Sequence, residues 1–143
     1  MVDVIVAGVL VACVDAWVIV DFYNNEFAVD LALAVSGKPG TQFEDAVPPD
    51  WRAARSIAER LFERTRDLRV AIAWTRAMVS LDGAATLPDS LRLIQGLLET
   101  YWDDLHPRPD DGDAYARINA LNDMCSPAGL LGELMMIALV RGV

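Results

Sequence analysis

From residue 23 onward, proline, glycine and aspartate divide the chain into segments whose apolar residues recur every three or four positions. This spacing gathers apolar side chains on one face of an α-helix, and Pro, Gly and Asp are residues that begin or end helices. No alternating pattern typical of strands appears after residue 22. The sequence therefore predicts an all-α fold, a single helical bundle of about six helices joined by short loops. The segments cover residues 24–37, 50–65, 67–83, 87–105, 113–125 and 126–142.

Cap signals and apolar stripes define the ends and faces of these predicted helices. Asp50 and Asp67 precede two segments as N-caps, and Ser126 precedes the last one. The segment 67–83 is apolar on two sides, which predicts a central helix that packs on more than one face. The stripe of segment 87–105 consists of Leu91, Ile94, Leu98, Tyr101, Trp102 and Leu105, and that of segment 113–125 consists of Tyr115, Ile118, Leu121 and Met124.

Length and charge limit the classes of function. The 143 residues suffice for one domain, and a chain with 54% hydrophobic and 23% charged residues is globular in composition. The net charge of -9 argues against sequence-general binding of nucleic acid, which needs a basic surface. The two cysteines, Cys13 and Cys125, lack metal-ligand spacing and are expected to be reduced. We therefore expect no nucleic-acid partner, no metal and no cofactor.

Residues 1–22 differ from the rest of the chain because they are rich in Val and other apolar residues. Their longest uncharged run, 4–14, is shorter than the ~20 residues that cross a bilayer, and no Lys or Arg precedes it as in a signal peptide. The β-branched residues favour a strand, although a short buried helix has the same apolar pattern. We expect a buried strand or helix, with a membrane or partner contact as the alternative. The chain is thus divided into a divergent apolar segment, 1–22, and a helical domain, 23–143.

The segment 101–113, YWDDLHPRPDDGD, concentrates acidic residues around the single histidine. Its carboxylates lack the spacing of an EF-hand loop, and zinc needs more His or Cys than His106 alone. Asp103 and Asp104 would point about 100° apart on a helix, so they would not converge on one substrate. Ion binding, and catalysis by Asp103, Asp104, His106 and Asp113, are the alternatives to a structural role.

The structural interpretation of this segment explains more of its residues. His106 is expected at the last turn of a helix, where the negative end of the helix dipole favours it, and Pro107 would end that helix. Asp110, Asp111 and Asp113 would gather at the start of the next helix, where carboxylates cap free N–H groups. We therefore predict no catalytic residues in this segment.

Arginines crowd one part of the chain, with six of the eleven between residues 52 and 69. The ordinary interpretation is a solvated helix surface stabilised by weak i,i+4 ion pairs. The alternative is a partner-docking face, because arginine is over-represented at binding hot spots. The candidate partner-binding residues are Arg52, Arg55, Arg60 and Arg64.

Several motifs together resemble a known family. RDLRVAIAWTRAMVSLDG and LRLIQGLLETYWDDLHPRPDDGDAYARINAL resemble the N-terminal, ImpA-type domain of the TssA family of bacterial type VI secretion systems. Tyr23, Glu26 and Phe27 resemble the Tyr-x-x-Glu-Phe of its first helix, and GKPGTQF followed by PPDWRAAR resembles its linker and next helix start. SPAGLLGELMMIALVRG resembles the closing segment, so the resemblance covers roughly residues 23–142.

The chain departs from the family pattern at both ends. Residues 1–22 lack the Pro-Ile-Ser…Cys-Gly-x-Asp-Leu segment that usually precedes the first helix. The C-terminal region with which TssA-like proteins form rings is also lacking, so ring formation is not expected of this chain. Within the matched part, the residues expected to belong to the family motif, in structural roles, are Tyr101, Trp102, Asp103, Leu105, His106, Pro107, Asp111, Gly112 and Asp113.

The resemblance implies a non-catalytic structural module for assembly of the secretion apparatus. The implied partners are the baseplate, the tail sheath or tube, or the inner-membrane complex, with self-association through the apolar segment as a further hypothesis. The implied localisation is cytoplasmic, or peripheral to the inner membrane within the apparatus. The alternatives are a membrane-associated accessory protein with the same domain and a hydrolase-like enzyme that uses residues 103–113.

Overall fold

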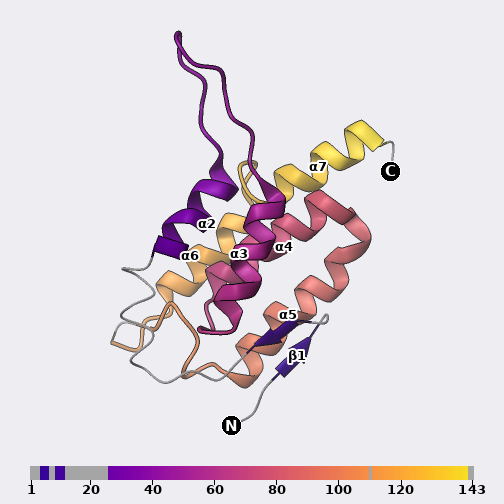
Figure 1. Ribbon diagram of the computed structural model, residues 1–143. Helices are drawn as coiled ribbons and strands as arrows, with labels where there is room; N and C mark the ends of the chain where they lie inside the picture. Colours follow the sequence, from indigo (N-terminus) through magenta and orange to yellow (C-terminus); the bar gives the residue numbers. More distant parts are fainter. Residues whose placement is uncertain (1–3, 7–8, 12–25, 110, 142–143) are drawn as a thin grey trace.

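The computed structural model describes residues 4–6, 9–11, 26–109 and 111–141, and Figure 1 shows a bundle of helices with two short strands beside it. This part of the chain contains six α-helices, so the predicted all-α bundle is confirmed. A short 3-10 helix, η1 (Ala84–Thr86), joins two of them. The α-helices are α2 (Glu26–Ser36), α3 (Trp51–Phe62), α4 (Leu68–Asp82), α5 (Leu87–Thr100), α6 (Tyr115–Met124) and α7 (Leu130–Arg141).

Helix α4 is the centre of the bundle, and α2, α3, α5, α6 and α7 all contact it. The prediction that this helix packs on more than one face is therefore confirmed. Burial extends around most of its circumference because neighbours cover several sides, and Arg69 is exposed on the remaining side. Its buried residues are Leu68, Val70, Ala71, Ile72, Ala73, Trp74, Thr75, Ala77 and Val79.

Trp74 joins α4 to α3 through its ring and its polar group. The ring meets Phe62 edge to face, with 6.4 Å between ring centroids. Its indole Nε1 donates a hydrogen bond of 3.2 Å to Glu59 Oε1. A buried Trp needs such an acceptor because its N–H is costly to bury unpaired. The α3–α4 contact thus combines aromatic packing with a satisfied donor.

The predicted caps of α3 and α4 are confirmed. Asp50 Oδ1 accepts a 3.0 Å hydrogen bond from the backbone N–H of Ala53. Asp67 Oδ1 accepts one of 2.8 Å from the N–H of Arg69, and Asp67 is fully buried whereas Asp50 is exposed. Gly83 ends α4 at φ +94°, a conformation that suits glycine.

Three predicted details of the later helices are wrong. Helix α5 ends at Thr100, not near residue 105, and it buries Leu93, Ile94 and Leu97 while Leu91 is 44% exposed. Leucines are available at both sets of positions, so packing against α4 decides which set turns inward. In α6 the predicted stripe residues Tyr115 and Ile118 are exposed.

The start of α7 also differs from the prediction. Ser126 does not cap this helix, which begins at Leu130. Its hydroxyl instead donates a 2.9 Å hydrogen bond to the carbonyl of Asp123 at the end of α6. Ser126 therefore closes the turn after α6 rather than opening α7.

The described part of the apolar N-terminal segment forms strands. β1 (Val4–Val6) pairs with β2 (Val9–Val11) in antiparallel register, Val4 opposite Val11. β1 lies beside α5, and β2 lies beside α3. The strand interpretation is thus the correct one for these six residues, while the rest of segment 1–22, with Tyr23, lies outside the described residues. No helix in the described part is long and apolar enough to cross a membrane.

The contrast between the two caps gives a test of the fold. Asp67→Ala removes a buried cap together with the ion pair between Asp67 and Arg69. It should lower the free energy of unfolding by about 2 kcal/mol, whereas Asp50→Ala at the exposed cap should cost about 0.5–1 kcal/mol. Urea unfolding followed by circular dichroism measures both. Equal losses in the two variants would contradict a special role for the buried cap.

Candidate functional site

The arginine cluster is divided by the fold. Arg52, Arg55 and Arg60 lie on α3, and Arg64 follows its end. Arg55 forms ion pairs with Glu59 at 3.2 Å and with Asp82 at 3.4 Å, so its charge is partly neutralised. The exposed members of this candidate docking face, called the α3 arginine face below, are Arg52, Arg60 and Arg64.

The two remaining arginines of the cluster belong to the interior or to a local pair. Arg66 is buried, and its guanidinium lies 4.1 Å from the centroid of the Tyr101 ring. Arg69 forms an ion pair with Asp67. These two side chains therefore stabilise the structure near the start of α4, and we do not count them as part of the α3 arginine face.

His106 lies in an extended stretch that pairs with the chain just before α4. Its N–H donates a 2.9 Å hydrogen bond to the carbonyl of Arg66, and its own carbonyl accepts one of 2.8 Å from the N–H of Leu68. The expectation that His106 sits in the last turn of a helix is therefore wrong, because α5 ends at Thr100. We call this pairing of residues 66–68 with His106 the 67/106 junction.

Arg117, which the sequence analysis did not single out, closes the 67/106 junction from α6. Its Nε donates a 2.9 Å hydrogen bond to the carbonyl of Pro107, and its Nη2 donates one of 2.6 Å to the carbonyl of Leu105. The guanidinium lies 4.4 Å from the centroid of the Trp102 ring, and the side chain is 1% exposed. The sequence pattern that could have indicated a buried Arg117 is its position in a short helix between two apolar residues, Tyr115 and Ile118.

The other motif residues occupy two different environments. Tyr101, Leu105 and Pro107 are buried with His106, whereas Asp103 and Asp104 are exposed. Among the described residues no group of three or more His, Cys, Asp or Glu side chains could hold a metal ion. The structure thus separates the buried imidazole from the exposed carboxylates of residues 103 and 104.

A tight turn and a cap follow in the acidic part of the segment. Asp111 has φ +47° and Gly112 has φ +82°, so consecutive residues adopt the left-handed conformation. Asp113 Oδ1 accepts a 2.9 Å hydrogen bond from the N–H of Tyr115 at the start of α6. Asp110 lies outside the described residues. The observed contact of Asp113 is of the capping kind that free N–H groups at a helix start need.

Burial sets the protonation of His106. The side chain is 4% exposed, and its Nε2 is buried without a hydrogen-bond partner in the described structure. Desolvation lowers the pKa of His106 below 6.5, Asp67 opposes this effect, and the positive charges of Arg108, Arg69 and Arg117 add to it. The imidazole is therefore held neutral in the folded protein near pH 7.

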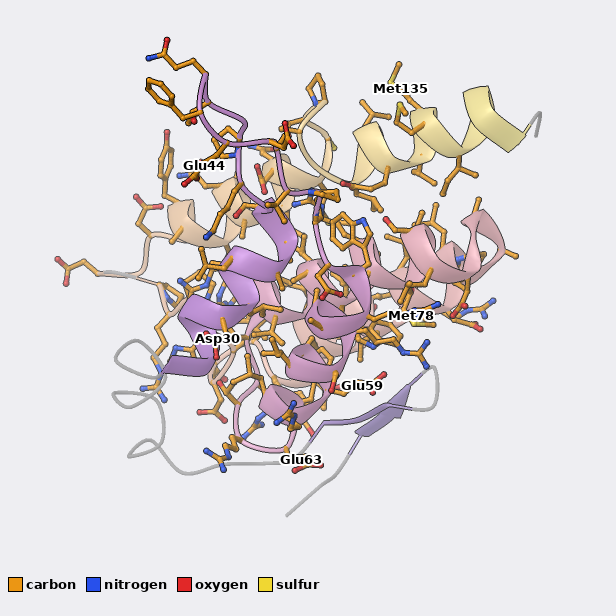
Figure 2. All side chains as sticks on the ribbon, turned by 45° about the horizontal axis from the view of Figure 1, so that its top comes forward. Asp30, Glu44, Glu59, Glu63, Met78 and Met135 are labelled. Atoms are coloured by element: carbon orange, nitrogen blue, oxygen red, sulfur yellow. The ribbon has the colours of Figure 1, made fainter. Side chains whose placement is uncertain are left out.

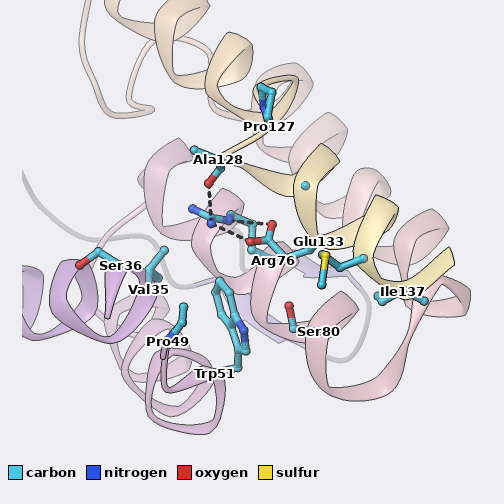
Figure 3. Close-up of a pocket in the computed structure, with 12 residues that line it drawn as sticks. Val35, Ser36, Pro49, Trp51, Arg76, Ser80, Pro127, Ala128, Glu133 and Ile137 are labelled. Carbon is cyan, nitrogen blue, oxygen red and sulfur yellow. Dashed lines mark hydrogen bonds and ion pairs between the residues drawn. The ribbon is translucent and has the colours of Figure 1, made fainter. Parts of the chain in front are cut away.

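An open groove of about 820 Å³ lies between the α2–α3 side of the molecule and α7 (Figure 3). Its apolar lining includes Val35, Pro49, Trp51, Met136 and Ile137. The groove crosses helices that are distant in sequence, so it exists only once α7 has docked on the bundle.

A largely buried ion pair, between Arg76 and Glu133, lines this groove, as Figure 3 shows. Arg76 Nε and Nη2 donate to the two carboxylate oxygens of Glu133 at 3.0 and 2.8 Å. Nη2 also donates to the carbonyl of Ala128 at 2.9 Å, and the guanidinium lies 5.3 Å from the Trp51 ring centroid. This fork of hydrogen bonds joins α7 to the central helix.

A neutral His106 makes the stability of the fold depend on pH. The unfolded chain binds a proton at His106 near pH 6.5, whereas the folded chain does so only at lower pH. The stability that the neutral imidazole of His106 contributes is therefore present above pH 6.5 and is lost as the pH falls. Urea unfolding at pH 7.5 and 5.5 should show a larger loss in the wild type than in His106→Gln. The carboxylates titrate in both proteins, so an equal loss would contradict the buried neutral imidazole.

Removing the guanidinium of Arg76 tests the attachment of α7. Arg76→Met leaves the largely buried carboxylate of Glu133 unpaired and should lower the free energy of unfolding by about 2 kcal/mol. The matched control is Arg92→Met, which removes an exposed ion pair with Asp89 and should cost about 0–0.5 kcal/mol. Chemical denaturation compares the two, and a similar small loss in both would show that the pair does not hold α7.

Comparison with known proteins relates this architecture to a secretion system. Residues 21–126 match the family described as ImpA, N-terminal, type VI secretion system. The Type VI secretion system component TssA1 of Pseudomonas aeruginosa is 40% identical over 126 residues, which cover 83% of this chain and 36% of that relative. The chain thus spans about a third of the length of that relative. No solved structure matches the chain. The chain belongs to the ImpA N-terminal family of type VI secretion system proteins.

Proposed function

We propose that this chain is a non-catalytic docking module that helps to assemble a type VI secretion apparatus. The observation that carries the proposal is the family match, which spans the bundle from its first described helix to the end of α6. The relative TssA1 is by name a component of such a system. The partner is a protein of the baseplate, of the sheath or tube, or of the inner-membrane complex.

The α3 arginine face is the proposed contact surface for that partner. Arg52, Arg60 and Arg64 are exposed along one helix and its end. On a chain of net charge -9, this local excess of positive charge favours an acidic patch on the partner. Arg55 contributes less in this proposal because it is only partly exposed. The module works on the cytoplasmic side of the apparatus.

A pull-down with immobilised chain tests the proposal. The immobilised chain is incubated with separately purified baseplate, sheath, tube and membrane-complex proteins. Each protein is tested at low and at physiological salt concentration. The chain should capture one of them, and the triple variant Arg52→Glu, Arg60→Glu, Arg64→Glu should capture it about tenfold more weakly, because charge reversal repels an acidic patch.

The matched control reverses the charge of an exposed arginine on another helix. Arg92 on α5 is exposed, so Arg92→Glu changes the net charge without touching the α3 arginine face. Capture should be unchanged in this control. If the triple variant binds as well as the wild type, the surface is elsewhere on the module; if no component is captured by the wild type, the docking proposal itself fails.

A further inference from the structure

The connection between α2 and α3, residues 37–50, projects far from the bundle (Figure 1). Its two limbs are paired near the base, because the N–H of Lys38 donates to the carbonyl of Val47 at 2.8 Å and the N–H of Val47 returns a bond of 2.9 Å. Near the tip, the N–H of Thr41 donates to the carbonyl of Glu44 at 2.8 Å. We call this element the 37–50 loop, and its backbone pairing makes it a small hairpin with a defined shape.

Two local features fix the tip and the base of the 37–50 loop. Thr41 Oγ1 accepts hydrogen bonds from the N–H of Phe43 at 3.3 Å and of Glu44 at 3.1 Å, which closes the tip. Gly37 has φ +62°, and a Cβ there would lie 2.3 Å from the carbonyl oxygen of Val47. Only glycine allows the limbs to pair at this distance. The sequence is therefore suited to holding the tip away from the core.

The 37–50 loop exposes several apolar side chains to solvent. Phe43 at its tip is 86% exposed, and Val47 is 53% exposed. Pro39, Ala46 and Pro48 are exposed as well. Single apolar residues on a surface are ordinary, but here they are carried together on an ordered projection, which is typical of a contact element. Aromatic side chains in addition are enriched among the residues that dominate binding.

The prolines restrict how this element can bind. Pro39 follows Lys38, and Pro48 follows Val47, so the residues next to the paired ones have no N–H to donate. A partner strand cannot extend the ladder past these positions. Recognition therefore relies on the side chains at the tip rather than on backbone pairing.

The charge beside the aromatic ring indicates the chemistry of the partner. Glu44 and Asp45 are exposed directly after Phe43, and Figure 2 shows Glu44 on the projecting loop. Lys38, the one basic residue of this stretch, lies at the base. An anionic lipid surface would repel this tip, because both carry negative charge. A protein with a basic surface fits both the ring and the carboxylates.

We propose that the 37–50 loop is an insertion element, in which Phe43 enters an apolar pocket of a protein of the secretion apparatus. Glu44 and Asp45 then pair with Arg or Lys side chains on the rim of that pocket. The inference rests on the proposed function, but it assigns a surface at the far end of the α2–α3 connection, separate from the α3 arginine face. An aromatic anchor within a charged rim has the arrangement of a binding hot spot.

Binding measurements with loop variants test the inference. Immobilised wild type, Phe43→Ser, Phe43→Leu and the double variant Glu44→Lys, Asp45→Lys are titrated with the same purified baseplate, sheath, tube and membrane-complex proteins. Phe43→Ser should weaken binding of the captured component at least about tenfold, as hot-spot truncation does, with Phe43→Leu in between. The double charge variant should weaken binding at low salt and reduce its salt dependence.

Two controls separate binding from folding. Leu91→Ser changes an exposed apolar residue on α5 and should leave binding unchanged. Because Phe43 is almost fully exposed, Phe43→Ser should keep the wild-type urea midpoint. Its loss of binding is then not a loss of structure.

Other outcomes would overturn the inference in distinguishable ways. Capture of a component with unchanged affinity in Phe43→Ser would exclude the 37–50 loop and leave the docking function intact. Absence of any capture by the wild type would overturn both. Phe43-dependent binding to phosphatidylglycerol vesicles, or Phe43-dependent dimerisation in light scattering, would replace the protein pocket by a lipid surface or a second copy.

Discussion

The 67/106 junction is the constraint on which the arrangement of the helices depends. One short backbone pairing, between His106 and the residues on either side of Asp67, joins the start of the central helix to the chain that leaves α5. Arg117 brings α6 to the same point by binding two carbonyl groups of this stretch. Because buried carbonyl groups need donors, the placement of α6 follows from where α5 ends. The motif that the sequence marks as unusual is thus the place where three helices are brought together.

Much of the fold could be predicted from sequence because the signals are local. The caps at Asp50 and Asp67 depend on residues within one helical turn. The apolar residues that bury α4 on several sides all lie within its own segment of the sequence. The inward face of α5 could not be predicted in the same way. Leu91 has as regular a helical spacing to Ile94 as Leu93 has to Leu97, and only the neighbouring helix determines that Leu91 is exposed while Leu93 is buried.

The candidate sites show the same division between local and distant information. The exposed arginines of α3 were predictable from helical spacing, but the ion pair of Arg55 with Asp82 crosses to another helix. Arg76 binds Glu133, which lies 57 residues further along the chain, so helical spacing could not have predicted that contact. The exposure of Phe43 was also hidden, since an aromatic residue among prolines gives no sign of whether it turns to the core or away. The proposed contact surfaces therefore depend in part on the three-dimensional arrangement, which the sequence alone does not give.

The sharp turn at Gly83 has a consequence for how the chain reaches this fold. It joins α4 to α5, which pack against each other, through a connection of residues 83–86 that contains η1, and residues 63–67 form a similarly short connection from α3 to α4. Two of the helices that pack against α4, namely α3 and α5, are therefore also the helices that precede and follow it in the sequence. Proteins rich in such short-range contacts lose little entropy in closing loops and tend to fold quickly. The three helices from Trp51 to Thr100 form a unit that can assemble first, and the segments after it then add to a surface that already exists.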